Sequence, residues 1–564
     1  MLTLLTKKKD VRNFFLIVSL TLTFFLDCNS QNLNWAYNIG DPNLNHTNAD
    51  ICCALTTDFE GNIYITGRFI NTVNFNPEGT PFYLSSSNAN VFDIYVAKYS
   101  SNFKLIWAIN LGGSGNGIGV SIKTDSLQNI YLSGNYIGSI DFDPSSNTSF
   151  IDSDNVSSFL AKYNSNGQFE WVKEVECNWQ KNEWFYGKQL FVDNSSNIYR
   201  YEKSTESLEK YDSFGNLTLK EYLKGSPVFD NNQFFYSFDN LTYNENLINI
   251  NSKDTIIFNK INLNGNKIKT KTISVSSDGD IGGFIYYDQK GNIILSGVYW
   301  GTCYFYGIDD TLTISNYDSV MVYEGIFNPI GREFIAKIDT LGNVKWVKSY
   351  HEKSPNPYII SINDNGDIFT LGMLIGSANF NPDGNTKLTS TSYGQHYIAK
   401  YDSSFNYLAG SLFLGGSYND EIRGFEIYND TAIIAGNFFN SIDMDLTSSN
   451  FLLSSEPSED IFIAKYSEFD ISTATEVSTK PQDSYNKIAV YPNPSSGLFN
   501  IGLKMNIGNS FINVYDLMGN KIYSNNINSD SFKLDLSQFK PGIYFLTIIQ
   551  EKEKITVKLV LNRR

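Results

Sequence analysis

Short runs of aromatic, aliphatic and β-branched residues alternate along most of the chain with clusters of Gly, Asn, Asp and Ser. Such runs between turn-forming residues are typical of strands. After the first thirty residues, no segment has the periodicity of an amphipathic helix of several turns. Some runs, such as Phe159–Ala161 and Ile461–Ala464, are apolar at consecutive positions, as expected of strands buried on both faces. The pattern therefore predicts an all-β protein.

Three of these runs return together in the same order, which indicates an internal repeat. Each copy has a strand after a turn, a strand containing Ala-Lys, and a strand carrying Trp. The clearest copies are Gly61–Gly67 with Ile94–Tyr99 and Leu105–Ala108, Asn129–Gly134 with Phe159–Tyr163 and Phe169–Val172, and Gly291–Gly297 with Phe334–Ile338 and Val344–Val347. A unit with its own strands and turns predicts a repeat architecture.

A complete unit contains four expected strands. In the first unit they are Ile63–Thr66, Thr72–Phe75, Ile94–Tyr99 and Leu105–Asn110. Four antiparallel strands in roughly 60 to 75 residues match a β-propeller blade with long loops. Seven units can be counted, of which two are shorter and degenerate and lie between Lys188 and Ser274. The clear ones begin near Ile51, Gly119, Gly282, Tyr358 and Ile422.

The last unit ends at Ile463–Tyr466 and lacks the Trp-bearing fourth strand. An unpaired copy of that strand, Leu33–Gly40, lies near the N-terminus instead. An open ring would leave strand edges exposed. We therefore expect a seven-bladed β-propeller over residues 32–470, in which Leu33–Ile39 pairs with Ile461–Tyr466 and closes the last blade.

The units resemble the bacterial β-propeller repeat family (SBBP-like), whose motif runs roughly D-x-x-G-N-x-Y-x-x-G and then D-x-x-x-A-K-Y-x-x-x-G-x-x-x-W. The resemblance covers about Asn32 to Asp470, and residues 188–274 depart from it. It implies a propeller fold and says almost nothing about function.

The N-terminus has the layout of a secretory signal peptide over residues 1–30. Three lysines and Arg12 precede an apolar run from Phe14 to Leu26, and polar residues follow. The run is shorter than the about 20 residues of a membrane span, and no later segment is apolar enough, so we expect no transmembrane segment in the mature protein. Cys28 leaves a lipoprotein as an alternative, which the preceding Asp27 disfavours.

The formal net charge is −16 at pH 7, which argues against nucleic-acid binding because that needs a basic surface. It suits solubility outside the cell. The cysteines and histidines form no metal-binding or catalytic spacing, so we expect no catalytic and no cofactor-binding residue among them, and we expect Cys52 and Cys53 to be buried apolar residues. These residues are Cys52, Cys53, Cys177, Cys303, His46, His351 and His396.

An Asx-x-Asx run recurs at an equivalent place in four units. The copies are Asn74–Pro77, Asp141–Pro144, Asn379–Pro382 and Asp443–Asp445. Alternating carboxylates can bind calcium, so Asp141, Asp143, Asp443 and Asp445 are candidate ligands and calcium is the one possible cofactor. Asx residues beside Pro also form turns by bonding their own backbone, and we favour this structural interpretation.

Two other patterns invite functional interpretations. Gly112–Gly119 resembles a phosphate-binding loop, but a strand is expected after it rather than a helix, which predicts a turn between blades. Four Trp residues recur at one repeat position and are expected to pack the scaffold, namely Trp35, Trp107, Trp171 and Trp346. Trp179, Trp184 and Trp300 lie outside the repeat and are better candidates for a binding surface.

A polar linker over residues 471–486 precedes a C-terminal module over residues 487–564. Seven short strands in this module predict a small β-sandwich. They are expected at Ile488–Tyr491, Leu498–Leu503, Phe511–Asp516, Lys521–Tyr523, Phe532–Leu536, Ile543–Ile549 and Lys554–Leu561.

Four phrases of this module resemble the type A C-terminal sorting domain of type IX secretion, a system of Bacteroidota. The residues that carry the resemblance are Tyr491, Pro492, Asn493, Pro494, Gly497, Tyr515, Asp516, Gly519, Gly542, Tyr544 and Lys558. The resemblance implies export to the cell surface or medium, the type IX machinery as a partner, removal of the tail, and anchoring to surface lipopolysaccharide. A carbohydrate-binding sandwich is the alternative for this module.

For the whole chain we expect a secreted or cell-surface scaffold without enzymatic activity, which binds a glycan, a protein or envelope material. A secreted polysaccharide hydrolase or lyase with acidic residues at the propeller funnel is the alternative. A structural or adhesion component is a third reading. Catalytic propellers exist, so the expected fold does not decide between them.

Overall fold

The computed structural model describes most of the predicted ring and the C-terminal module. The described residues are 32–40, 50–175, 188–230, 234–239, 255–276, 281–288, 290–299, 301–308, 310–316, 319–323, 326–329, 332–349, 356–363, 365–374, 376–382, 384, 386–390, 395–415, 420–428, 431–446, 451–467, 488–491, 495, 497–503, 510–516, 520–527, 531–550 and 553–561. The predicted signal peptide and linker lie outside them, as do Cys28, His46, Cys177, Trp179, Trp184, Trp300 and His351.

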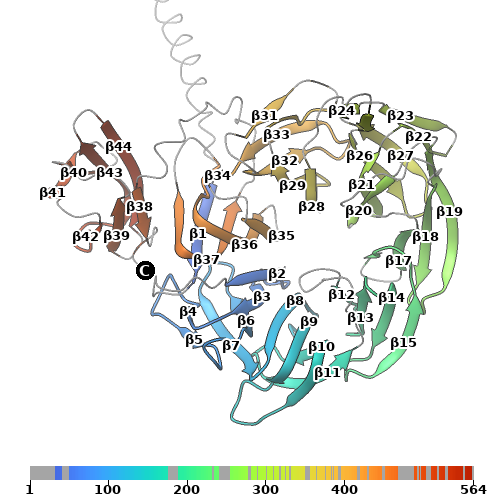
Figure 1. Cartoon of the computed structure of the whole chain (residues 1–564), viewed down its shortest axis with the longest axis horizontal. Helices are drawn as coiled ribbons and strands as arrows, with labels where there is room; N and C mark the ends of the chain where they lie inside the picture. Colours follow the sequence, from blue (N-terminus) through green and yellow to red (C-terminus); the bar gives the residue numbers. More distant parts are fainter. Residues whose placement is uncertain are drawn as a thin grey trace, which may run out of the picture.

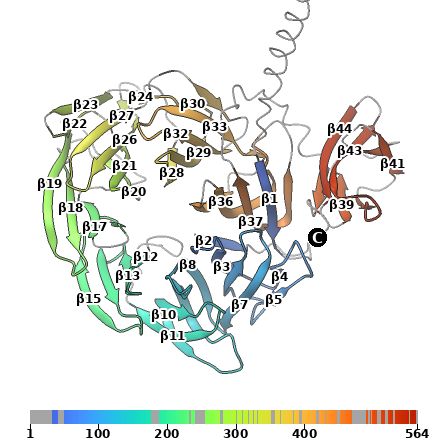
Figure 2. The ribbon, with the colours of Figure 1, turned by 180° about the vertical axis from the view of Figure 1, so that it is seen from behind.

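Every regular element in the described residues is a strand, which confirms the all-β class. The strands up to β37 form a ring of radiating antiparallel sheets (Figure 1), and the view from behind shows the same ring (Figure 2). This arrangement confirms the propeller fold. Among the described residues, no helix is long and apolar enough to cross a membrane.

We interpret the strand pairing as seven four-stranded blades. From the inner to the outer strand, blade 1 consists of β2 (Ile51–Thr57), β3 (Ile63–Phe69), β6 (Asp93–Tyr99) and β7 (Leu105–Gly113), and blade 2 of β8 (Asn116–Thr124), β9 (Ile130–Asp141), β10 (Phe150–Tyr163) and β11 (Phe169–Val175). Blade 3 consists of β12 (Lys188–Val192), β13 (Ile198–Glu202), β14 (Ser207–Tyr211) and β15 (Leu217–Tyr222). Blade 4 consists of β16 (Val228–Phe229), β17 (Phe234–Asp239), β18 (Thr255–Asn262) and β19 (Lys267–Ser276).

Blades 5 to 7 complete the ring. Blade 5 consists of β20 (Ile281–Asp288), β21 (Asn292–Tyr299), β26 (Arg332–Asp339) and β27 (Val344–Ser349). Blade 6 consists of β28 (Asn356–Ile362), β29 (Ile368–Leu374), β32 (Gln395–Tyr401) and β33 (Tyr407–Leu412). Blade 7 consists of β35 (Glu421–Tyr428), β36 (Thr431–Asp443), β37 (Leu452–Ser467) and β1 (Asn32–Ile39). The degenerate stretch between Lys188 and Ser274 thus contains the four-stranded sheet β12 to β15 and the first four strands, β16 to β19, of a six-stranded sheet.

Short additional strands lie outside this four-strand pattern. β22 (Gly301–Tyr306) pairs with β23 (Thr311–Asn316) and also with the outer strand β19, so a hairpin that follows β21 extends blade 4. The others are β24 (Ser319–Tyr323) with β25 (Ile326–Pro329), β30 (Ser377–Asn379) with β31 (Lys387–Thr389), and β34 (Leu414–Gly415), which pairs with β36.

The predicted second strand of the first unit, Thr72–Phe75, was assigned wrongly. β4 (Thr72–Asn74) pairs with β5 (Tyr83–Ser85) in a separate hairpin, and the missing blade strand is the inner strand β2. Phe75 is fully buried, which gave the segment the apolar pattern of a blade strand. The Asn74 side chain nevertheless accepts backbone N–H groups from Asn76 and Phe82, so the chain turns back here.

The glycine that ends the second-strand motif makes room for the inner strand. A Cβ on Gly67 would lie 1.8 Å from the Ile51 carbonyl oxygen, and one on Gly436 would lie 2.0 Å from that of Glu421. In both blades the inner strand has a register shift at this point. A side chain there would force the two strands apart.

Ring closure follows the prediction. β1 pairs antiparallel with β37, with Leu33 opposite Tyr466 and Ile39 opposite Ile461. The N-terminal strand is therefore the outer strand of the last blade.

One joint recurs between neighbouring blades. Trp107 of blade 1 donates from Nε1 to the Ser165 carbonyl of blade 2 at 3.2 Å, and Trp171 of blade 2 donates to the Ser213 carbonyl of blade 3 at 3.1 Å. Gly167, which follows Ser165, has a φ of +76°, and a Cβ on it would lie 3.1 Å from the Trp107 ring. Each outer-strand indole therefore packs on the outermost turn of the next blade.

The same joint connects the last blade to the first. Trp35 of β1 packs against Phe103 with ring centroids 4.8 Å apart, and Lys465 of β37 donates to the Ser101 carbonyl at 2.7 Å. Ser101 and Phe103 lie in the turn between β6 and β7. The predicted packing role of the repeated Trp residues is confirmed at these joints.

The C-terminal module is the predicted sandwich. One sheet has the order β38 (Ile488–Tyr491), β39 (Leu498–Leu503) and β42 (Ser531–Asp535), and the other β41 (Lys521–Ile527), β40 (Ser510–Asp516), β43 (Gly542–Gln550) and β44 (Glu553–Leu561). Both sheets contribute to one core, for example Phe499 and Ile501 from the first, and Val514 and Leu546 from the second. All seven expected strands are present.

We expect Trp107→Ala to lower the free energy of unfolding by about 2 kcal/mol, because it removes an aromatic contact and a hydrogen bond between blades. Ile106→Ala is the matched control, since its neighbouring side chain is 49% exposed and such changes stay within about 0.5 kcal/mol. Chemical denaturation of both variants measures the difference. Equal stability of the two variants would contradict the role of Trp107 in stabilising the junction between blades.

Candidate functional site

The Asx-x-Asx runs act as turns in the described structure. Asp141 Oδ1 accepts the backbone N–H groups of Asp143 at 3.0 Å and Ser149 at 2.7 Å. Asp443 Oδ1 does the same for Asp445 at 3.0 Å and Phe451 at 2.7 Å.

The residue between the two Asx positions fixes this turn to its blade. Phe142 and Met444 are fully buried. Their carbonyls accept hydrogen bonds at 2.9 and 2.8 Å from Tyr163 and Tyr466, the tyrosines of the Ala-Lys-Tyr motif. These contacts support the structural interpretation of the motif.

Calcium binding at Asp141, Asp143, Asp443 and Asp445 stays a prediction. Within the part of the chain that the structure describes, no group of three or more His, Cys, Asp or Glu side chains is arranged to hold a metal ion.

We expect Asp443→Asn to keep the stability of the protein within about 0.5 kcal/mol, because the amide keeps the Oδ1 acceptor and Asn379 stands at the equivalent place in blade 6. Asp443→Ala, which removes the acceptor, should cost about 1–3 kcal/mol. Thermal unfolding with and without calcium provides the measurement. A calcium-dependent midpoint that Asp443→Asn abolishes would favour the metal site.

Gly112–Gly119 is the interblade turn that its sequence predicts. β7 ends at Gly113 and β8 begins at Asn116, so the loop leads from the outer strand of blade 1 to the inner strand of blade 2. No helix N-terminus follows it, as a phosphate-binding loop would require.

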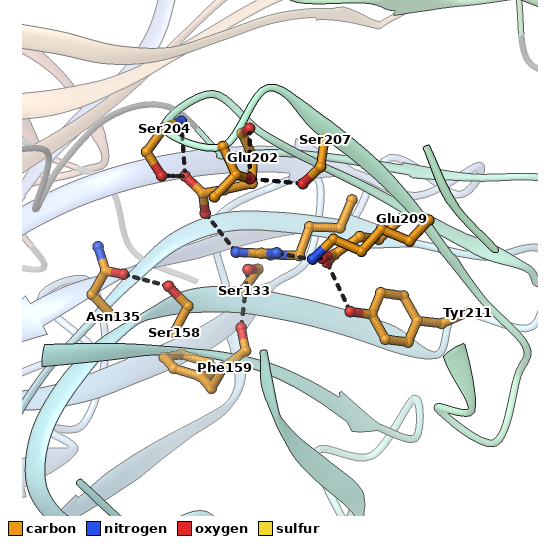
Figure 3. A network of polar contacts seen from close by, with 12 residues as sticks. Ser133, Asn135, Ser158, Phe159, Glu202, Ser204, Ser207, Glu209 and Tyr211 are labelled. Carbon is orange, nitrogen blue, oxygen red and sulfur yellow. Dashed lines mark hydrogen bonds and ion pairs between the residues drawn. The ribbon is translucent and has the colours of Figure 1, made fainter. Parts of the chain in front are cut away.

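Figure 3 shows a buried polar network where blade 3 faces blade 2. Arg200 on β13 is fully buried, and its guanidinium donates to the Glu202 carboxylate at 2.5 Å and to Glu209 at 2.7 Å. Tyr211 donates to Glu209 at 2.8 Å, and Lys220 Nζ lies 3.0 Å from the other oxygen of that carboxylate. The charges of this network are therefore compensated inside the fold.

Electrostatics supports a structural role for the network. Burial alone would raise the pKa of Glu209, but the Arg200 guanidinium and hydrogen bonds from Tyr211, Lys220 and Arg200 hold it below its ordinary value. Because Arg200, Glu202 and Glu209 are almost completely buried, a ligand cannot reach them without opening the blade junction.

The repeat itself shows why this network was missed. Glu202 stands where blades 1 and 2 have Gly67 and Gly134, and Arg200 stands where they have Ile65 and Leu132. The sequence departs from the repeat here, and the signal that could have revealed the network is that Arg200 and Glu202, two positions apart, lie on the same face of one strand.

We expect Arg200→Met to destabilise the protein by about 3–5 kcal/mol at pH 7, because it leaves two buried carboxylates without their cation. Lys220→Met, at a side chain that is 37% exposed, should cost less than about 1 kcal/mol. The lowered pKa of Glu209 means that the native network stabilises above the ordinary glutamate value of 4.5 and loses its effect as the pH falls through the lower folded value. Arg200→Met should lose this acid sensitivity in unfolding experiments between pH 3 and 7.

A second charged cluster is partly open to solvent and lies at the seam where blade 7 meets blade 1. We call it the seam cluster, and it consists of Asp50, Arg68, Asp420, Glu421, Arg423 and Glu459. Glu421 begins the inner strand β35, Arg68 belongs to β3, and Glu459 to β37. Tyr428, at the other end of β35, donates to the Phe59 carbonyl in the turn between β2 and β3, so the cluster lies on the opposite face of the ring from that turn.

Specific contacts hold the seam cluster together. Glu421 and Arg423 form an ion pair, and their side chains are 41% and 12% exposed. The Asp50 backbone N–H donates to the Glu459 carbonyl at 3.0 Å. The Arg68 guanidinium lies over the Phe92 ring, 4.1 Å from its centroid.

Glu459 is the electrostatically unusual member. Burial, followed by the nearby Glu421 carboxylate, raises the pKa of Glu459 to about 7, and Asp420 adds to the rise while Asn437 and Arg423 oppose it. Its carboxyl group therefore exists in both protonation states near neutral pH. A carboxyl of this kind beside an ionised one can bind hydroxyl groups or move a proton.

The cysteines beside this cluster are not activated. Cys52 is buried and Cys53 half-buried, and both are free thiols. Burial raises the pKa of each to about 12 despite the nearby Arg423, so neither is a thiolate at neutral pH.

Sequence reasoning missed the seam cluster because its members come from the first and the last repeat, which are far apart in the sequence. The available signal was Glu459, which occupies the position of Phe92 in blade 1. Only ring closure brings Glu459 beside Arg68 and Asp50.

The sorting-motif residues fall mainly at turns of the sandwich. Asp516 accepts from the Asn520 backbone at 2.8 Å, and Tyr544 donates to the Lys540 carbonyl at 2.6 Å. A Cβ on Gly497 would lie 2.8 Å from the Ser537 Cα. Tyr491 ends β38, Tyr515 lies on β40, Gly542 begins β43 and Lys558 lies on β44. Pro492, Asn493, Pro494 and Gly519 lie outside the described residues.

Residues 489–562 match the model of the secretion system C-terminal sorting domain. This sorting domain marks the chain as a protein secreted by the type IX system and attached to the cell surface, and it implies interaction with that machinery. The predictions of the tail and of its destination are confirmed.

Other comparisons cover less or agree less closely. The chain is 34% identical over 77 residues to an endo-acting ulvan lyase from Formosa agariphila, which is 13% of this chain and only 15% of the relative. Among solved structures, virginiamycin B lyase from Staphylococcus aureus is 10% identical, with 77% of this chain and 98% of that chain covered and a TM-score of 0.37. PorZ of Porphyromonas gingivalis is 10% identical, with 91% and 81% covered and a TM-score of 0.20. At such scores these structures carry no functional argument.

Proposed function

We propose that the protein is a surface-displayed propeller that binds a glycan through the seam cluster, without catalysing a reaction. The observation that carries this proposal is the Glu421–Arg423 pair, whose side chains are 41% and 12% exposed, beside Glu459 on the inner side of blade 7. Carboxylates and guanidiniums on a rigid sheet can bind neighbouring hydroxyl groups of a sugar with paired hydrogen bonds.

Within the described ranges, the residues that repeat from blade to blade are poor candidates for ligand binding, because they have structural roles. The repeated Trp residues and the Asx-x-Asx runs are engaged in blade joints and turns. The seam cluster instead combines polar groups with partial exposure, and Glu421, Arg423 and Glu459 depart from the repeat. Departures from a repeat are where a scaffold acquires a particular function.

Export and repeat family complete the proposal. The N-terminal segment acts as the signal peptide, the repeats belong to the bacterial β-propeller repeat group of Bacteroidota, and the tail anchors the protein to surface lipopolysaccharide. A protein or envelope ligand in place of a glycan, and a purely adhesive role, are compatible with the same display.

A polysaccharide hydrolase or lyase is the second candidate, and one observation favours it. Glu459, whose pKa is raised to about 7 beside Glu421, has the protonation behaviour of a general acid with an ionised partner. Such an enzyme would protonate the leaving oxygen of a glycosidic bond from Glu459.

Binding of the full chain to immobilised glycans, followed by calorimetry on the best ligand, tests the proposal. We expect Glu421→Gln and Arg423→Gln to weaken binding about tenfold or more, which corresponds to about 1.4 kcal/mol. Asp154→Asn, at an exposed carboxylate of blade 2, should leave it unchanged. Release of new chain ends that Glu459→Gln abolishes would replace the binding role with the enzymatic one, and absence of any glycan ligand would reject both.

A further inference from the structure

We propose that blade 1 binds a calcium ion through Asp93 Oδ1 and Asn110 Oδ1, beneath the loop of residues 86–92 that joins β5 to β6. Asp93 begins β6, and Asn110 lies on the outer strand β7. This site is separate from the seam cluster and from the Asx-x-Asx runs. It does not depend on the proposed glycan-binding function.

Asp93 is a buried carboxylate without a cation. Its side chain is fully buried, and its Oδ2 accepts from the Ser87 N–H at 2.6 Å, the Ser87 hydroxyl at 2.8 Å and Asn110 Nδ2 at 2.9 Å. Its Oδ1 has no hydrogen-bond partner among the described residues. The buried Asp58, by comparison, has Lys98 Nζ at 3.9 Å. An ionised carboxylate inside a protein is costly unless a cation compensates it.

Asn110 supplies a second oxygen of the same kind. Its Nδ2 donates to the Ser85 carbonyl at 3.0 Å and to Asp93 Oδ2 at 2.9 Å. Since both partners are acceptors, the amide orientation is fixed, and both amide protons are used. Asn110 Oδ1 is also buried and has no donor in the described part of the chain. Two neighbouring groups thus each present an oxygen that only a donor or a cation can satisfy.

The chemistry of the two oxygens suits calcium. Calcium binds carboxylate, amide and main-chain carbonyl oxygens and completes its coordination with water. Residues 87–90 are exposed, so water and ions reach the loop above the site. The loop also contacts the start of blade 2, because Asn88 Nδ2 donates to the Gly113 carbonyl at 2.8 Å and the Phe92 N–H donates to Asn116 Oδ1 at 3.0 Å. A metal ion here would strengthen the connection between blades 1 and 2.

The same Asp–Asn contact occurs in blade 7 and provides a comparison. Asn38 Nδ2 donates to Asp460 Oδ2 and to the Ser454 carbonyl, both at 3.3 Å. The contact alone is therefore part of the scaffold. The observation that points to a ligand in blade 1 is the pair of buried oxygens without donors.

Thermal unfolding of the full chain, titrated with calcium or magnesium after treatment with EDTA, tests the proposal. We expect calcium to raise the midpoint, with half of the effect at about 10⁻⁴–10⁻³ M, and magnesium to act more weakly because it dehydrates reluctantly. Asp93→Asn should weaken the apparent calcium affinity at least about tenfold. This variant should still fold in EDTA, because its amide keeps the acceptor for Ser87 and adds a donor. Asp460→Asn is the matched control and should keep the calcium response.

Hydrogen exchange locates the effect. Calcium should slow the exchange of backbone amides in residues 85–93 of the unmodified chain and of Asp460→Asn, but not of Asp93→Asn. Asn110→Asp provides a second variant, in which two carboxylates replace one. Their repulsion should lower the midpoint in EDTA, and calcium should restore it with an affinity at least about tenfold tighter than that of the unmodified chain.

Several results would overturn the inference. A calcium response that survives in Asp93→Asn but disappears in Asp443→Asn would place the metal ion at the Asx-x-Asx runs. An equal response to magnesium would exclude a calcium site. Absence of any response to metal would show that a proton or water satisfies the two oxygens, and slower exchange away from residues 85–93 would contradict the location. None of these results bears on glycan binding by the seam cluster.

Discussion

The contact on which the ring depends is the joint between the outer half of one blade and the outermost turn of the next. An indole on the outer strand and a lysine on the third strand reach a turn whose carbonyls point back to them, as Trp107 reaches Ser165 and Lys465 reaches Ser101. A blade sheet is apolar on both faces and is not stable alone. The regular use of one joint therefore fixes both the angle between blades and the closure of the circle.

Much of this architecture was predictable because its signals are local and repeated. Each repeat contains a turn such as Asp58–Asn62, the Ala-Lys-Tyr strand and the Trp strand. Each of these elements forms within a few residues and recurs in several blades. The unpaired copy Leu33–Gly40 was enough to predict closure against β37. The wrong assignment of Thr72–Phe75 to a blade strand has a physical cause as well. Phe75 is buried although it lies at a turn, so the segment has the apolar residues expected of a strand.

The candidate site was not predictable in the same way. The seam cluster joins residues from both ends of the ring, and only closure brings Arg68 and Asp50 of blade 1 beside Glu459 of blade 7. The Arg200 network depends likewise on which strand face meets blade 2. The sequence showed that residues 188–274 depart from the repeat, but convergence of side chains is a property of the folded ring and not of any one repeat.

Closure by β1 also sets the order in which the protein can become complete. Asn38 contacts Asp460, 422 positions further along the chain, so the first strand to be synthesised is the last to find its partner. Such long-range pairing is slow because loop-closure entropy must be overcome before the contact is gained. Until β1 pairs with β37, the outer edge of blade 7 stays exposed and the blade has only three of its four strands. The strand nearest the N-terminus therefore completes the blade nearest the C-terminus of the ring.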